Sequence, residues 1–122
     1  MKDWTVLLVD DEEEFISALA ERLTLRGIQA RTATNGEQAL AAIEDVAPQV
    51  VVLDLMMPGM SGVEVLKHIR VTHPEIKVVL LTGHGSTREG MEGMRLGAFD
   101  YLMKPLSIDE LVEKLRDAVG SE

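Results

Sequence analysis

The stretch VVVLDLMMPGMSG, residues 50–62, decides the fold class of this chain. Its four consecutive aliphatic residues, 50–53, are typical of a strand that is buried on both faces of a parallel sheet. The aliphatic run ends at Asp54, and Pro58 and Gly59 then indicate a loop. A carboxylate at the end of an apolar strand costs desolvation free energy unless it has a charged or hydrogen-bonding partner or a functional role. Asp54 is therefore a candidate functional residue.

The alternation of a strand pattern with a helix pattern repeats along the chain. The predicted strands are 5–9, 28–32, 50–55, 77–81 and 99–103. Helical periodicity follows each strand. The first helix is expected to end before Gly27, the second to be capped by Asn35 and to stop before Pro48, and the third to end by Pro74. The fourth is expected at about 87–96, and the fifth is expected to be capped by Ser107. Five such βα repeats predict an α/β fold, a doubly wound sandwich around a parallel sheet.

The composition describes one domain, residues 1–122. With 46% hydrophobic residues and 122 residues in all, the chain is long enough for a single core. The absence of Cys excludes disulfides, a thiolate zinc site and a Cys nucleophile. The net charge of −9 argues against direct nucleic-acid binding by this chain and favours proteins or cations as partners. No apolar run approaches the length of a membrane span, and no secretory signal is present, so a cytoplasmic location is expected, with no membrane partner.

Polar side chains follow four of the predicted strands. Asp10 and Asp11 follow the first, Asp54 ends the third, Thr82 ends the fourth and Lys104 ends the fifth. Reactive groups of doubly wound folds lie beyond the carboxyl ends of the strands, so these side chains are expected to converge. Carboxylates a few ångströms apart repel each other, and a dication would neutralise them. Mg²⁺ fits, because it prefers oxygen ligands from one or two carboxylates, water and phosphate.

These groups are the parts that phosphoryl transfer requires: a carboxylate nucleophile, a metal ion, a lysine and a hydroxyl donor. The chain has no GxxxxGK[ST] loop, and Asp10 and Asp11 stand where a glycine-rich dinucleotide loop would follow the first strand. A bound nucleotide is therefore not expected to be the source of the phosphoryl group.

The order of these motifs resembles the receiver domain of bacterial two-component response regulators over essentially the whole chain. The stretches that carry the resemblance are VLLVDDE (6–12), VVLDLMMPGMSG (51–62), VVLLTGHGS (78–86) and GAFDYLMKP (97–105). The resemblance implies a flavodoxin-like fold with strand order 2-1-3-4-5, an order for which a receiver of this family is a standard example.

The resemblance also implies roles for individual residues. Asp54 is expected to accept a phosphoryl group from a kinase phosphohistidine. Asp10, Asp11, Asp54 and the backbone carbonyl of Met56 are expected to hold Mg²⁺, with Asp10 acting mostly through water.

The phosphoryl group itself is expected to be gripped by Thr82 and Lys104, assisted by the backbone N–H groups of Met56 and Gly83. Tyr101 resembles the aromatic switch residue that works with Thr82. The Lys104–Pro105 peptide bond is expected to be cis.

The function implied is a phosphorylation-dependent signalling switch and not an enzyme, although the domain would take part in its own phosphorylation and autodephosphorylation. Its partners would be a histidine kinase or histidine phosphotransfer protein, and an output protein or covalently linked effector domain. The surface that changes on phosphorylation would be that of the fourth helix, fifth strand and fifth helix.

Two other functions are alternatives to the signalling switch. A phosphatase of the haloacid dehalogenase kind also uses Asp, Thr, Lys and Mg²⁺, but those enzymes resemble a DxDx pattern early in the chain with the metal acids late. A flavodoxin-like flavin binder shares the fold, but the chain has no obvious phosphate loop and few aromatic residues to stack on a flavin ring.

Three groups of residues have both a structural and a functional interpretation. Residues 12–14 are expected to be a solvated first turn favoured by the helix dipole, rather than extra ligands. Met91 and Met94 lie at i and i+3, which favours core packing, although Met also suits partner surfaces. His84 is expected to be an exposed loop residue, with a possible role in tuning the lifetime of the phosphoryl group.

Overall fold

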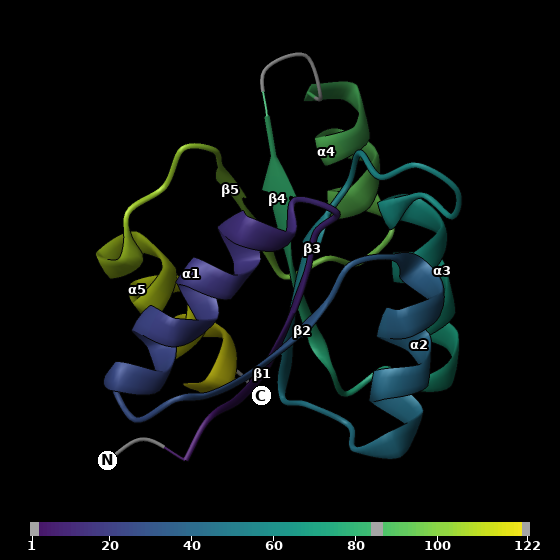
Figure 1. The fold of residues 1–122 in the computed structure, drawn as a ribbon. Helices are drawn as coiled ribbons and strands as arrows, with labels where there is room; N and C mark the ends of the chain where they lie inside the picture. The colour runs from purple at the N-terminus through teal and green to yellow at the C-terminus, as the bar shows by residue number, and fades with distance from the viewer. Residues whose placement is uncertain (1–2, 84–86, 121–122) are drawn as a thin grey trace.

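A computed structural model describes residues 3–83 and 87–120 of the chain, in which strands and helices alternate (Figure 1). The elements are β1 (Thr5–Val9), α1 (Glu13–Leu25), β2 (Gln29–Ala33), α2 (Gly36–Asp45), β3 (Val50–Asp54), α3 (Gly62–Thr72), β4 (Lys77–Thr82), α4 (Thr87–Arg95), β5 (Asp100–Met103) and α5 (Ile108–Gly120). The predicted strands and helices are all present: β1 has the predicted limits, and the limits of the other strands differ from the predicted ones by one residue.

The five strands form one parallel sheet in the order β2-β1-β3-β4-β5. This confirms the α/β doubly wound fold and the strand order that the resemblance implied. In the register between β1 and β3, Val9 pairs with Leu53. The residues that follow this pair, Asp10 and Asp54, are therefore level with each other on neighbouring strands.

Helices cover both faces of the sheet. In Figure 1, α1 and α5 lie on one side of the strands, and α2, α3 and α4 lie on the other. Alternate residues of each central strand belong to the two apolar clusters, so that in β3 Val50 and Val52 face α1 and α5, whereas Val51 and Leu53 face α2 and α3. Each fully buried aliphatic side chain of this kind contributes about 1.5–3 kcal/mol to stability. The sheet is thus a rigid base for the residues at its carboxyl edge.

Polar side chains stabilise the start of three helices. Asn35 accepts a hydrogen bond from the backbone N–H of Gln38 and so caps α2, as predicted. Ser61 and Glu64 form a capping box at α3. The hydroxyl oxygen of Ser107 accepts a hydrogen bond from a backbone N–H in the first turn of α5, again as predicted.

Gly62, the first residue of α3, lies directly against the end of β3. A Cβ atom at this position would lie 2.3 Å from the carbonyl oxygen of Asp54 and 2.6 Å from the Cα of Leu55. Because both atoms belong to the backbone, only glycine allows α3 to start this close to Asp54. The glycine at position 62 therefore helps to position Asp54 at the end of β3.

The prediction that Met91 and Met94 pack in the core is wrong. Their exposed fractions are 62% and 38%. The residue of α4 that packs against the sheet is Gly93, where a Cβ would lie 2.4 Å from Cδ1 of Leu80. The helix approaches β4 through a glycine, and the methionines remain exposed.

Within residues 3–83 and 87–120, no helix combines the length and apolar character needed to cross a membrane.

Candidate functional site

Three polar or charged side chains are buried among the described residues: Asp10, Asp54 and Thr82, with exposed fractions of 0%, 6% and 6%. All three end or directly follow a central strand, at the carboxyl edge of the sheet. All three were predicted site residues. Polar groups are buried at a cost unless they are paired or used, so this edge is where the fold departs from a purely apolar interior.

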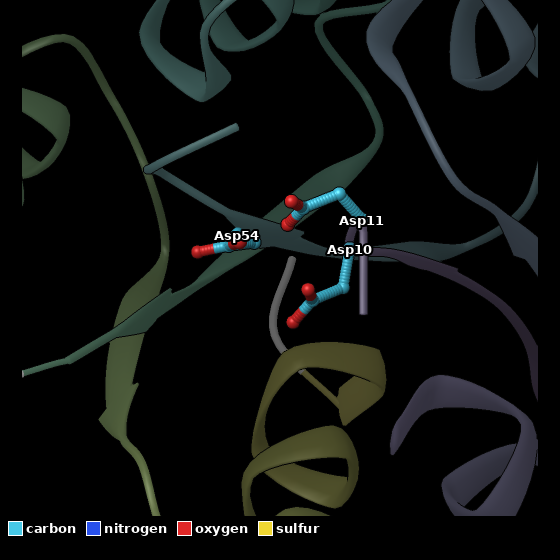
Figure 2. Close-up of side chains that lie close together, drawn as sticks. All are labelled: Asp10, Asp11 and Asp54. Carbon is cyan, nitrogen blue, oxygen red and sulfur yellow. The ribbon is translucent and has the colours of Figure 1, made fainter. Parts of the chain in front are cut away.

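Asp10, Asp11 and Asp54 form one acidic cluster (Figure 2). A carboxylate oxygen from each lies within 4.8 Å of one from each of the others. Asp10 and Asp54 are buried, whereas Asp11 is exposed to solvent. The cluster therefore has a closed side within the fold and an open side toward water.

Backbone N–H groups hold two of these carboxylates in place. Oδ1 of Asp10 accepts a hydrogen bond of 2.9 Å from the N–H of Glu12. Oδ1 of Asp54 accepts one of 3.2 Å from the N–H of Met56. The backbone of Met56, predicted to contribute both its N–H and its carbonyl, thus lies next to Asp54, while its side chain is 59% exposed.

Lys104 supplies the positive charge of the site. Its Nζ lies 2.7 Å from Oδ2 of Asp10, 2.7 Å from Oε1 of Glu12 and 4.0 Å from Oδ2 of Asp54. It also lies 4.9 Å from the centre of the Phe15 ring, within the range of a cation–π contact. Burial on its own lowers the pKa of Lys104, but its contacts with Asp10 and Glu12 and the charge of Asp54 raise this pKa above its ordinary value. Lys104 is therefore charged at neutral pH.

The pKa of Asp54 is raised from 3.8 to about 6. Desolvation by burial is the largest cause, and the charge of Asp10 adds to it. Lys104 and the hydrogen bond from Met56 act in the opposite direction without reversing the shift. An Asp with a raised pKa beside other carboxylates has the environment expected of a functional group.

Glu12 is a site residue that the sequence reasoning missed. It was expected to be solvated with its two neighbours, but its side chain accepts no capping hydrogen bond from the backbone of α1 and instead accepts one from Nζ of Lys104. A signal was available: Glu12 directly follows the acidic pair, at the N-cap position, where Glu is a poor substitute for Ser, Thr, Asp or Asn.

Thr82 lies at the end of β4, and its hydroxyl donates a hydrogen bond of 3.4 Å to the backbone carbonyl of Leu102 on β5. Tyr101, also on β5, is 49% exposed. A pocket of about 380 Å³ is lined by both Thr82 and Tyr101. Its lining residues are Thr82, Gly83, Gly90, Met91, Met94, Tyr101 and Met103.

The structure describes one of the two remaining predicted features, a cis peptide bond, and not the other, His84. The Lys104–Pro105 peptide bond is cis, as the resemblance implied. His84 lies outside the described residues.

The donor set fits Mg²⁺. The three clustered carboxylates offer hard oxygen ligands, the type that Mg²⁺ prefers. Oδ2 of Asp10 is buried and accepts no hydrogen bond of good geometry, although the ammonium of Lys104 lies close to it as an ion-pair partner. Asp11 leaves one side open to solvent, from which a hydrated ion could enter.

Comparison with known proteins agrees with this geometry. The sequence model of the response regulator receiver domain family matches residues 6–116. The transcriptional regulatory protein CpxR of Klebsiella pneumoniae is 43% identical over 111 residues, which are 91% of this chain and 47% of that protein. The DNA-binding transcriptional regulator NtrC of Salmonella typhimurium is 36% identical over 98% of this chain and 26% of its own length.

Solved structures agree as well. The crystal structure of the receiver domain of NtrX from Brucella abortus superimposes with a TM-score of 0.91 at 36% identity, covering 96% of this chain and 99% of that one. The chain spans about half or less of the length of the curated relatives named above, but nearly all of this isolated receiver domain.

Proposed function

The chain belongs to the response regulator receiver domain family, whose members are regulatory phospho-acceptor domains of two-component systems, and we propose that Asp54 is the residue of this chain that accepts the phosphoryl group. The observation that carries the proposal is the burial of Asp10, Asp54 and Thr82 together at one sheet edge, beside Lys104. Membership of this family also removes the phosphatase and the flavin binder as alternatives.

The proposed reaction is attack by the Asp54 carboxylate on the phosphorus of a phosphohistidine in a partner protein. A bond forms between a carboxylate oxygen and phosphorus, the bond from phosphorus to the imidazole nitrogen breaks, and that nitrogen keeps the bonding electron pair. With a pKa of about 6, Asp54 is mostly ionised at neutral pH and has the lone pair that this attack requires.

Other residues are proposed to hold the transferred group. The ammonium of Lys104, 4.0 Å from Asp54, would bind a phosphate oxygen after a small movement. Thr82 would donate its hydroxyl to a second oxygen, and the backbone N–H groups of Met56 and Gly83 would bind others. Each of these donors would stabilise the negative charge on an oxygen of the phosphoryl group during its transfer.

Receiver domains generally bind Mg²⁺, and in this chain we propose that Asp10, Asp11, Asp54 and the carbonyl of Met56 hold it. The bound ion would neutralise the clustered carboxylates and the oxygens of the incoming phosphoryl group. Asp10, which is already ion-paired with Lys104, would contribute mostly through water.

The phosphoryl donor is proposed to be a histidine kinase or histidine phosphotransfer protein, and the target an output protein or a linked effector domain. Residues 1–122 would act as one receiver domain. The proposed output surface comprises α4, β5 and α5, where apolar side chains are exposed. Those side chains are Met91, Met94, Tyr101 and Met103.

Labelling with a small phosphodonor tests the proposal. Acetyl phosphate with Mg²⁺ should add one phosphoryl group to the intact protein, through a bond that is stable in acid and labile in base. Omission of Mg²⁺ or the substitution Asp54→Asn should prevent the addition. Full labelling of Asp54→Asn would place the acceptor elsewhere and refute the assignment.

A further inference from the structure

Lys104 is held by two carboxylates that are not Asp54. Its Nζ lies 2.7 Å from both Oδ2 of Asp10 and Oε1 of Glu12, whereas Oδ2 of Asp54 is 4.0 Å away. Since hydrogen bonds of this type end near 3.2 Å, the ammonium does not bond to Asp54 in this state. It must exchange a partner or move before it can bind a phosphate oxygen on Asp54.

The two partners of Lys104 differ in how easily they are released. The side chain of Asp10 is fully buried and fixed by the N–H of Glu12, so it has no room to withdraw. The side chain of Glu12 is 63% exposed, so water can replace the ammonium as its partner. Exposed ion pairs are weak for this reason. Glu12 is therefore the partner that Lys104 can exchange.

Among the described residues, the ammonium of Lys104 is the hydrogen-bond and ion-pair partner of the Glu12 side chain. Glu12 occupies the N-cap position of α1, but its side chain accepts no hydrogen bond from the helix. Its neighbours Glu13 and Glu14 carry the same charge, and within the described parts of the chain neither forms an ion pair with Lys104. The contact thus depends on the position of Glu12 and not on the acidity of the turn alone.

We propose that Glu12 is a positioning residue, which holds the ammonium of Lys104 away from Asp54 until a phosphoryl group on Asp54 displaces it. The inference rests on the proposed acceptance of a phosphoryl group by Asp54. The phosphate oxygens compete with the Glu12 carboxylate for the same ammonium, while the pair between Lys104 and Asp10 persists. Glu12 thereby stabilises the resting state relative to the phosphorylated state and raises the threshold for switching.

The resting contact can be measured without any metal or phosphate. In the metal-free protein labelled with ¹⁵N and ¹³C at lysine, the ammonium and Cε signals of Lys104 should differ between the wild type and Glu12→Gln. Glu13→Gln, which removes the same charge from the same turn, should leave these signals unchanged. Equal spectra for the wild type and Glu12→Gln would overturn the proposal.

The consequence for switching is measured by the affinity of a phosphate mimic. At saturating Mg²⁺, Glu12→Gln should bind beryllofluoride about two- to fivefold more tightly than Glu13→Gln, the range that corresponds to the loss of an exposed ion pair. Glu12→Asp, with the charge kept on a shorter side chain, should lie between Glu12→Gln and the wild type. Equal affinities for Glu12→Gln and Glu13→Gln would show that only net charge matters, and would overturn the proposal.

The two measurements separate this inference from the function on which it rests. Failure of wild-type protein to bind beryllofluoride with Mg²⁺ would contradict the proposed function, and the lysine spectra would still decide whether Glu12 holds Lys104. Binding by the wild type with no difference between the two Gln variants would contradict the inference alone. Because Glu12 is exposed and caps nothing, its variants are expected to remain folded.

Discussion

The hydroxyl of Thr82 is joined to the backbone of Leu102 by a hydrogen bond of 3.4 Å, which links the end of β4 to β5. At this length the hydrogen bond is weak, so little free energy is lost when the hydroxyl turns toward a stronger acceptor. A phosphoryl group on Asp54 would be such an acceptor, because hydrogen bonds to charged oxygens are about twice as strong as those between neutral groups. Because Thr82 and Tyr101 line the same pocket, a movement of the hydroxyl would change the surroundings of the Tyr101 ring.

Replacement of Thr82 should therefore separate phosphorylation from the response of the surface. In Thr82→Ala, Asp54 should still be labelled, but beryllofluoride with Mg²⁺ should no longer shift the amide resonances of α4 and β5 or bury the Tyr101 ring. Thr82→Ser keeps the hydroxyl and should retain the response. A normal shift of these resonances in Thr82→Ala would refute the link.

The raised pKa of Asp54 predicts a pH-dependent stability. Its folded-state pKa of about 6 exceeds its ordinary value of 3.8, so between these values the folded protein binds more protons at this site than the unfolded chain. The contribution of Asp54 to the free energy of unfolding therefore falls as the pH rises through this window. Asp54→Asn lacks this titration and should be more stable than the metal-free wild type at neutral pH, by about 3 kcal/mol, the free-energy equivalent of this pKa shift.

Urea unfolding in the presence of a chelator measures the difference in the free energy of unfolding between Asp54→Asn and the wild type. The two proteins should have similar stability near pH 4, where Asp54 is protonated in the folded state, and should diverge as the pH rises to about 7. An Asp54→Asn variant with the same stability difference at both pH values would contradict the assigned pKa.

Binding of Mg²⁺ to the acidic cluster should stabilise the folded chain. If the ion binds the folded site and not the unfolded chain, as proposed, millimolar Mg²⁺ should raise the melting temperature by mass action. Asp11→Asn should largely abolish this rise, because it removes the exposed carboxylate on the open side of the cluster. Glu13→Gln serves as the control for loss of charge. A melting curve of the wild type that Mg²⁺ leaves unchanged would count against the site.

The two glycines of α4 should respond in opposite directions to replacement by Ala. At Gly90 a Cβ would lie 3.4 Å from Cγ2 of Thr82, an ordinary contact, so Gly90→Ala should stabilise the protein by about 0.5–1 kcal/mol through helix propensity. At Gly93 the 2.4 Å approach to Leu80, which is fully buried, should cost about 1–3 kcal/mol and outweigh that gain. Thermal unfolding of the two variants tests the pair, and stabilisation by both would contradict the tight packing of α4 on β4.

The sequence predicted the sheet and the residues at its edge, because both follow from local patterns. The solid aliphatic runs of β1, β3 and β4 are what a strand buried on both faces requires, and each polar residue that ends such a run marks the carboxyl edge. Asp10, Asp54 and Thr82 were found for this reason, and they are the buried polar residues of the described chain.

What the sequence did not predict depends on contacts between distant segments. The pair between Glu12 and Lys104 joins residues 92 positions apart, so the position of Glu12 before the first helix could single it out but could not identify its partner. Met91 and Met94 have a spacing that suits a buried helix face, but the approach of Gly93 to Leu80 decides which face is buried. Tertiary packing set these positions, and a pattern of period 3.6 does not contain that information.

The most direct test of the central claim is to locate the phosphoryl group in the chain. After treatment of the wild-type protein with acetyl phosphate and Mg²⁺, digestion under acidic conditions and mass spectrometry should find one phosphoryl group, on the peptide that contains Asp54 and on its carboxylate. No other peptide should carry it, and Glu13→Gln should give the same result. A phosphoryl group on Asp10, Asp11 or any residue other than Asp54 in the wild type would contradict the account.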